Sequence, residues 1–312
     1  MKKKIGFFKK PQGVFTEDFI GEIKETLMNI EGIELFTELD YREAFVKNGE
    51  VYIGDFNLNQ LDVYFWHDIV HVKLWKGDNY ILNVLSALEK DCVVVNSVKS
   101  SRIVNDKYLS HLELLKAGLP VSDFSLVNIK NRDAVRNAFN GMGGSVLLKP
   151  RYGGFGSGIV KIDSEERLFE VLEFMQNYVE APDQQILMER FYENDIEKWT
   201  SVVVFGDKVL FGYRKKVLGD SDWKVYDPER KDAKGQFTDY VKVDEELAVL
   251  ALKAKNAIGK DIICFDFIHT KEGWKIIDEN GRPGLYRHCL EAAGVDLKKE
   301  VVDLILSKIK KD

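Results

Sequence analysis

The sequence contains no apolar run of about 18 residues, the length that an α-helix needs to cross a bilayer. Met1-Lys2-Lys3-Lys4 leads into a short apolar stretch that does not resemble the apolar region of a signal peptide. The net charge is only −6, which gives no reason to expect nucleic acid or an anionic membrane as a partner. We therefore expect a soluble, cytoplasmic protein, and the sequence leaves a homo-oligomer open.

Paired or metal-binding cysteines are missing as well. Cys92, Cys264 and Cys289 are odd in number and lack the spacing of metal ligands. The first two lie in apolar stretches, where reduced core residues are expected. No Gly-x-Gly-x-x-Gly follows the first expected strand, residues 5–8, so a dinucleotide cofactor is not expected.

The length of 312 residues and the hydrophobic content of 45% allow a full core and two or three subdomains. Expected strands and helices alternate over roughly the first hundred residues, which predicts an open, mostly parallel α/β layer. Asn48-Gly49 is a strong two-residue turn signal and predicts a hairpin over residues 44–53.

The middle of the chain carries a glycine-rich stretch from Lys149 to Gly158, which reads Lys-Pro-Arg-Tyr-Gly-Gly-Phe-Gly-Ser-Gly. Apolar runs precede and follow it, so we interpret it as the tip of a β-hairpin. Glycines allow positive φ and a close approach of a ligand, and consecutive N–H groups can bind an anion. Lys149 adds a positive charge where phosphates would lie. A flexible hairpin with an ordinary surface lysine explains this stretch, taken alone, equally well.

A second hairpin is predicted from residues 265–268 and 274–280, joined by a glycine-containing turn. Positions i and i+2 of a strand share a face, so Asp278 and Asn280 point one way and Glu279 points the other. Asp266 lies on the partner strand and is expected near them. Two carboxylates and an amide oxygen suit Mg²⁺ held between protein and nucleotide phosphates, with Mn²⁺ as an alternative. A polar strand end before a Pro-Gly turn is the other interpretation.

Taken in order, these motifs resemble the ATP-grasp superfamily, and most closely the carboxylate–amine ligases related to the ribosomal-protein glutamate ligase, the RimK-like group. The resemblance covers nearly the whole chain and rests on Asn105-Asp106-Lys107, Lys149 with its loop, residues 186–191, Asp266, Asp278-Glu279-Asn280 and Pro283-Gly284. It implies an α/β fold of the ATP-grasp type in three parts. These are an N-terminal open α/β pre-ATP-grasp domain (1–104), a small α+β lid with the glycine-rich loop (105–190) and a C-terminal α+β base with the metal site (191–312).

The resemblance also implies which residues hold ATP. Lys107 and Lys149 would bind the α- and β-phosphates, and Asp106 is expected to cap the helix that Lys107 begins. The γ-phosphate would be covered by the loop of Gly153, Gly154, Phe155, Gly156, Ser157 and Gly158.

The hinge between lid and base is implied to bind adenine and ribose. Glu189 would approach the exocyclic amine, and Phe191 or Tyr192, in the same stretch as Arg190, would supply main-chain contacts. Glu197 is the expected ribose ligand, with Asp195 as its rival. A solvated loop carboxylate remains the alternative for either acid.

The implied reaction has two steps: ATP with Mg²⁺ phosphorylates a substrate carboxylate, and an amine then displaces phosphate. Arg214 opens a basic cluster with Lys215 and Lys216, and it is expected, together with Arg282, to grip the carboxylate or the transferring phosphate. A basic strand end is also commonly just solvated. Ribosomal-type ligases usually carry Asp-x-Arg where this chain has Trp199-Thr200-Ser201, which puts the acceptor site in doubt.

The expected substrates are a small carboxylate and an amine, amino acids or small peptides first. The alternatives are a ligase that modifies a peptide or protein, including macrocycle formation, and a non-catalytic ATP-binding regulator. His67, Asp68 and His71 follow an expected strand at an edge where α/β proteins commonly bind ligands, so a substrate contact is favoured over a metal site. Hydrogen-bonded structural residues are the other interpretation, and two histidines four apart are more often of that kind. Residues 218–240 are expected to form a loop that closes over substrate, with disorder as the alternative.

Overall fold

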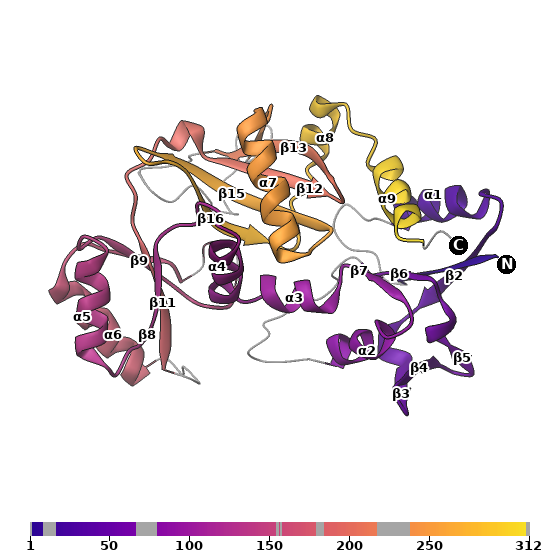
Figure 1. The fold of residues 1–312 in the computed structure, drawn as a ribbon, viewed down its shortest axis with the longest axis horizontal. Helices are drawn as coiled ribbons and strands as arrows, with labels where there is room; N and C mark the ends of the chain where they lie inside the picture. Colours follow the sequence, from indigo (N-terminus) through magenta and orange to yellow (C-terminus); the bar gives the residue numbers. More distant parts are fainter. Residues whose placement is uncertain are drawn as a thin grey trace.

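The computed structural model describes residues 2–8, 17–66, 80–153, 156, 158–178, 184–216 and 238–309. Within these ranges the strands form an N-terminal parallel sheet, a small hairpin sheet, a lid sheet and a base sheet. Figure 1 shows the lid at one end of the molecule, the N-terminal sheet at the other and the base between them. Among the described residues, no helix combines the length and the apolar character that crossing a membrane requires.

The N-terminal sheet is parallel throughout, with strand order β2-β1-β6-β7. Parallel strands are buried on both faces, which explains their short, continuous apolar runs. Helices α1 and α9 cover one face, and α2 packs on the other. This arrangement confirms the predicted open α/β layer. Its elements are β1 (Lys3–Phe8), α1 (Glu17–Met28), β2 (Ile33–Leu39), β6 (Val63–Phe65), α2 (Tyr80–Leu88) and β7 (Val93–Val95).

A three-stranded antiparallel sheet lies beside this layer and contains the predicted Asn48-Gly49 hairpin. Asn48 and Gly49 have φ values of 52° and 84°, the left-handed backbone that a two-residue turn between twisted strands requires. The hairpin is therefore confirmed. The sheet consists of β3 (Ala44–Lys47), β4 (Glu50–Ile53) and β5 (Phe56–Asn57), flanked by the short helices η1 (Tyr41–Glu43) and η2 (Leu58–Gln60).

The lid is an antiparallel sheet of order β10-β9-β11-β8 with α5 and α6 packed on it. The apolar residues of β9 and β10 pair with each other, Leu148 opposite Val160, which confirms the hairpin predicted around the glycine-rich stretch. Two helices, α3 (Val98–Val104) and α4 (Lys107–Lys116), lead into the lid. The lid elements are β8 (Phe124–Asn128), α5 (Arg132–Gly141), β9 (Val146–Lys149), β10 (Val160–Ile162), α6 (Glu165–Tyr178) and β11 (Gln185–Arg190).

The base is an antiparallel sheet of order β14-β13-β12-β15-β16. Helices α4 and α7 pack against one face, and the other face joins the core of the N-terminal layer together with α8 and α9. The C-terminal helix α9 therefore lies against α1 (Figure 1). The base elements are η4 (Ile196–Lys198), β12 (Thr200–Phe205), β13 (Lys208–Lys215), β14 (Thr238–Val241), α7 (Glu245–Ile258), β15 (Ile262–Thr270), β16 (Gly273–Asn280), α8 (Arg287–Ala293) and α9 (Leu297–Ser307).

The lid and the base meet along β16, the last strand of the base sheet. The segment after α4 extends that edge: the Ile276 N–H donates to Pro120 O at 2.8 Å, and the Ser122 N–H donates to Ile276 O at 2.9 Å. The chain then continues directly into β8 of the lid. Residues from α4, the lid and the base are thereby brought together at one joint.

Candidate active site at the joint of lid and base

The facing carboxylates of the β15–β16 hairpin form the centre of the site. In the register of this hairpin Asp266 pairs directly with Asp278, and Cys264 pairs with Asn280. Asp266, Asp278 and Asn280 therefore share one face of the sheet, as the alternation of strand positions predicts. The register shifts by one residue at Ile277, and this bulge turns its carbonyl toward the lid, where it accepts a hydrogen bond from Lys149 at 3.0 Å.

Each of the two carboxylates is paired with a lysine. Lys107 at the start of α4 bonds to Asp278. Lys215 Nζ lies 2.5 Å from Asp266 Oδ2, and Ser201 Oγ donates to Asp266 Oδ1 at 2.6 Å. Each carboxylate thus has a lysine ammonium group beside it. A divalent cation bound to the two carboxylates would bring positive charge to the same place. The hard oxygen donors of Asp266, Asp278 and Asn280 fit Mg²⁺.

The charges of this cluster support one another. Burial raises the pKa of the Asp278 carboxyl, but Lys107 and Lys149 outweigh it and hold the pKa below its usual value. Burial lowers the pKa of Lys107 and Lys215, yet the facing Asp278 and Asp266 raise both above the usual value of a lysine. Asp278, Lys107 and Lys215 are therefore all charged at neutral pH, so Asp278 is available as an anionic ligand.

Lys149 stands at the end of β9 and is buried against β11. Its Nζ lies 2.6 Å from Glu189 Oε2, in addition to its bond to Ile277 O. The loop that follows has positive φ at Gly153, Gly156 and Gly158 (123°, 65° and 76°), as its glycine content predicts. Gly154, Phe155 and Ser157 lie outside the described residues.

The N-terminus of α4 is fastened to this loop. Asp106 caps the helix by accepting from the N–H groups of Tyr108 and Leu109, which confirms the predicted cap. Its carboxylate also takes the Arg151 guanidinium, with Nη2 at 2.7 Å from Oδ2, and the Lys107 N–H donates to Arg151 O at 3.1 Å. Lys107 is therefore held at a defined place relative to the glycine-rich hairpin.

The hinge residues predicted to bind adenine are engaged with the protein itself. Glu189 is 1% exposed, and its Oε2 takes Lys149 and accepts from Ser122 Oγ at 3.0 Å. The Phe191 N–H donates to Ser145 O at 2.9 Å. The Arg190 guanidinium stacks on Tyr192 at 4.7 Å from the ring centroid. In this structure the Glu189 carboxylate orients Lys149, and its role toward adenine remains a prediction.

The predicted ribose ligand and one predicted arginine lie together. Glu197 is largely exposed and accepts from Arg214 Nη1 at 3.0 Å. Its rival Asp195 caps η4 by accepting from the Glu197 N–H, which leaves Glu197 as the better candidate. Arg282 is partly buried just beyond β16.

Comparison with known proteins identifies the family. Residues 104–305 match the family model of the RimK-like ATP-grasp domain. The chain belongs to the RimK-like ATP-grasp family. The probable alpha-L-glutamate ligase of Haemophilus influenzae is 24% identical over 216 residues, covering 69% of this chain and 67% of that protein. The D-alanine–D-alanine ligase of Limosilactobacillus fermentum is 27% identical over 261 residues, covering 78% and 67%.

Solved structures agree on the ATP-grasp fold. The structure of the ATP-grasp ligase PsnB complexed with minimal precursor, Mg and ADP matches with a TM-score of 0.66 at 16% identity, covering 98% of both chains. The resemblance inferred from the sequence is thus confirmed. As a RimK-like ATP-grasp protein, the chain is an ATP-dependent ligase that forms carbon–nitrogen bonds, and the family uses ATP and Mg²⁺.

Two polar residues of this candidate site had no role of their own in the prediction: Ser201 was given none, and Lys215 was named only as a member of the basic cluster with Arg214. Lys215, rather than its neighbour Arg214, pairs with Asp266, because adjacent residues of β13 point to opposite faces. Ser201 pairs with Asp266 across β12 and β15. Strand alternation could have predicted that Lys215 and Ser201 face Asp266, but only if the register between the strands had been known. His111 and Glu279 are buried at the same joint, and no role was predicted for either from the sequence.

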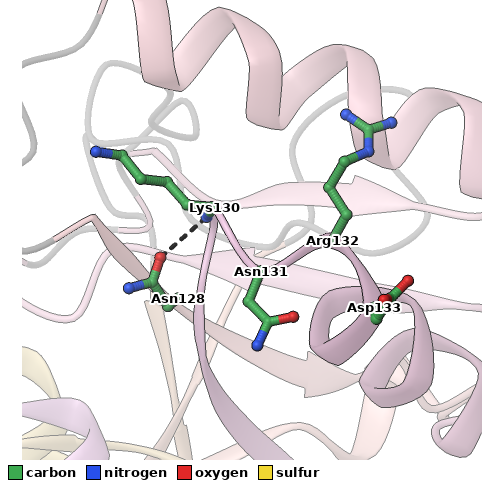
Figure 2. Close-up of a pocket in the computed structure, with 5 residues that line it drawn as sticks. All are labelled: Asn128, Lys130, Asn131, Arg132 and Asp133. Carbon is green, nitrogen blue, oxygen red and sulfur yellow. Dashed lines mark hydrogen bonds between the residues drawn. The ribbon is translucent and has the colours of Figure 1, made fainter.

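Some predictions concern places other than the joint. His67, Asp68 and His71, and most of the 218–240 segment, lie outside the described residues. A depression at the β8–α5 turn of the lid is shown in Figure 2, where the Lys130 N–H donates to Asn128 Oδ1 at 2.9 Å. Its lining consists of lid residues alone, and none of them belongs to the predicted ATP site: Asn128, Lys130, Asn131, Arg132 and Asp133.

Proposed function

We propose that this RimK-like ligase joins the carboxylate of an amino acid or similar small acid to an amine through an acyl phosphate. The observation that carries the proposal is the pair of facing, lysine-neutralised carboxylates, Asp266 and Asp278, beside Lys149 and its glycine-rich hairpin. This arrangement offers two acidic ligands to a metal and two ammonium groups to a polyphosphate within one joint. Phosphoryl transfer requires such positioning and charge neutralisation rather than a nucleophilic side chain.

In the first step the substrate carboxylate oxygen attacks the γ-phosphorus and ADP leaves. In the second the amine nitrogen attacks the acyl carbon, the bond from that carbon to the phosphate oxygen breaks, phosphate departs with the bonding electrons and the nitrogen loses a proton. Mg²⁺, held by Asp266, Asp278 and Asn280, would supply a Lewis acid for the phosphate oxygens.

The other residues of the site have roles that follow from their charge and place. Lys107 and Lys149 hold the phosphates, and the loop of residues 153–158 covers them. Arg214 and Arg282 bind the negative charge of the carboxylate or of the transferring phosphoryl group. The hinge stretch of residues 189–192 holds adenine, and Glu197 holds the ribose.

Phosphate release tests this function directly. Purified protein with ATP and Mg²⁺ is assayed across amino acids, singly and in pairs, with Asp278→Ala as the control, and products are identified by mass spectrometry. We expect release that needs a specific acid and amine and that disappears in the variant.

Silence across the panel, with ATP binding intact by calorimetry, would contradict a free amino-acid ligase. A short peptide panel is the next assay in that case, since another structure of PsnB contains a precursor peptide. ATP hydrolysis that is independent of both acid and amine would contradict ligase chemistry altogether.

A further inference from the structure

Three buried ionisable side chains meet next to Lys107 and Lys149, the proposed phosphate ligands. His111 comes from α4, Glu189 from the lid strand β11 and Glu279 from the base strand β16, and they are 0%, 1% and 3% exposed. The imidazole lies between the two carboxylates: Nε2 is 3.2 Å from Glu189 Oε1, and Nδ1 is 3.5 Å from Glu279 Oε2. One side chain from each part of the joint thus contributes to a single ionic cluster.

The charge balance of this cluster depends on the histidine. Both ring nitrogens face a carboxylate oxygen, so both favourable contacts need an N–H, as in the imidazolium form. Neither Glu279 oxygen has a hydrogen-bond partner among the described residues. A buried carboxylate without a counter-charge is costly, and the imidazolium supplies that charge. Burial lowers the pKa of His111, but Glu189 and Glu279 together raise it to about 9.

The cluster connects to the ATP site along two short paths. Through Glu189 it reaches Lys149, because the second oxygen of that carboxylate holds the ammonium group at 2.6 Å. Through α4 it reaches Lys107, which lies one turn before His111 on the same side of the helix. Lys107 and His111 contact the consecutive residues Asp278 and Glu279 of β16. Figure 1 shows α4 beside β16, next to the lid strands β9 and β11.

We propose that His111 is a positioning residue: by bridging Glu189 of the lid to Glu279 of the base it fixes the places of Lys149 and Lys107, and so sets nucleotide affinity without touching the nucleotide. This inference rests on the proposed role of these lysines as phosphate ligands. The competing explanation is that His111 only compensates the charge of Glu279 and supports folding. The two explanations differ in what happens when both members of that pair are removed.

The double variant His111→Leu/Glu279→Leu separates them. Replacing a buried ion pair by apolar residues is often neutral or stabilising, so the melting temperature should stay near that of the wild type. If His111 positions Glu189, the double variant should still bind ATP with Mg²⁺ about 10-fold or more weakly than the wild type in calorimetric titration. This is the lower end of the loss seen when an outer-shell partner of a binding site is removed. Wild-type affinity in the stable double variant would overturn the proposal.

A second comparison keeps the proposal testable if the double variant folds poorly. His111→Gln removes the positive charge, whereas Leu114→Ala weakens the same helix in the base core without touching Glu189. Measured below both melting temperatures, His111→Gln should lose at least about 10-fold in ATP affinity and Leu114→Ala less than about 2-fold. Equal losses in the two variants would show a merely structural histidine.

A separate variant, Lys149→Met, distinguishes a wrong role for His111 from a wrong role for the lysines. If Lys149→Met binds ATP as tightly as the wild type, the phosphate role of the lysines is wrong, and the proposal for His111 is overturned with it. If Lys149→Met abolishes binding while the histidine variants bind normally, only the positioning role is wrong.

Discussion

Replacing Glu189 with glutamine removes one negative charge from the centre of the lid–base joint. The carboxylate is buried against two cations, Lys149 and His111. Burial raises the pKa of Glu189, but Lys149 and His111 lower it by more, from the usual 4.5 to about 2. At about 1.4 kcal/mol per pH unit, that difference corresponds to roughly 3 kcal/mol of unfolding free energy at neutral pH.

The sign of the pH dependence follows from the lowered pKa of Glu189. Its stabilisation is complete above pH 4.5, where the carboxyl is ionised in both states, and it is lost as the pH falls from 4.5 through about 2. We therefore expect Glu189→Gln to be about 3 kcal/mol less stable than the wild type at pH 7, with the gap narrowing toward pH 3.

Urea unfolding curves of both proteins at pH 7, 4.5 and 3 measure this gap. Asp133→Asn is a suitable control, because its carboxylate is exposed on α5 and paired only at the surface with Arg136. A loss for Glu189→Gln below about 1 kcal/mol at pH 7 would refute the reasoning, since breaking a buried ion pair costs about 3–5 kcal/mol. A gap that stays constant between pH 7 and 3 would refute it too.

Three further outcomes are expected. Because the pKa of His111 is raised to about 9, the stabilisation by its imidazolium is complete below pH 6.5 and lost as the pH rises through 9. Between pH 6.5 and 10, the unfolding free energy of the wild type should therefore fall by roughly 3 kcal/mol more than that of His111→Leu/Glu279→Leu. Urea unfolding in which both proteins lose the same free energy over this pH range would contradict this. Gly158→Ala forces a side chain at φ +76° with Cβ 2.8 Å from Pro150 Cγ, so calorimetry should show about 1–3 kcal/mol of destabilisation, and an unchanged melting temperature would show that the loop relaxes freely. Asp266→Asn removes the negative charge of a proposed metal ligand, so substrate-dependent phosphate release should fall by about 100-fold or more; wild-type rates would exclude Asp266 as a ligand.

Local patterns gave much of the fold and the outline of the site. The two hairpins, the Asn48-Gly49 turn and the Asp106 cap depend on residues close in the chain, where backbone preferences and strand alternation decide the outcome. The shared face of Asp278 and Asn280 also follows from alternation alone. These features are confirmed because few alternatives satisfy the same local rules.

Local patterns could not predict the contacts between segments that are distant in the sequence. Lys107 and Asp278 are 171 residues apart, and their pairing depends on how α4 packs on the edge of β16. The bulge at Ile277 gives Lys149 its carbonyl partner, and nothing in the local sequence demands an extra residue there. Glu279 was expected only to face away from the metal ligands, and the contact that buries it comes from His111 on a different element.

Calorimetric titration of ATP with and without Mg²⁺, on the wild type and on Asp266→Asn/Asp278→Asn, tests the central claim most directly. If the facing carboxylates hold the metal of Mg²⁺–ATP, Mg²⁺ will tighten ATP binding to the wild type, and this gain will disappear in the double variant while it stays folded by circular dichroism. An equal Mg²⁺-dependent gain in both proteins would place the metal elsewhere and contradict the account.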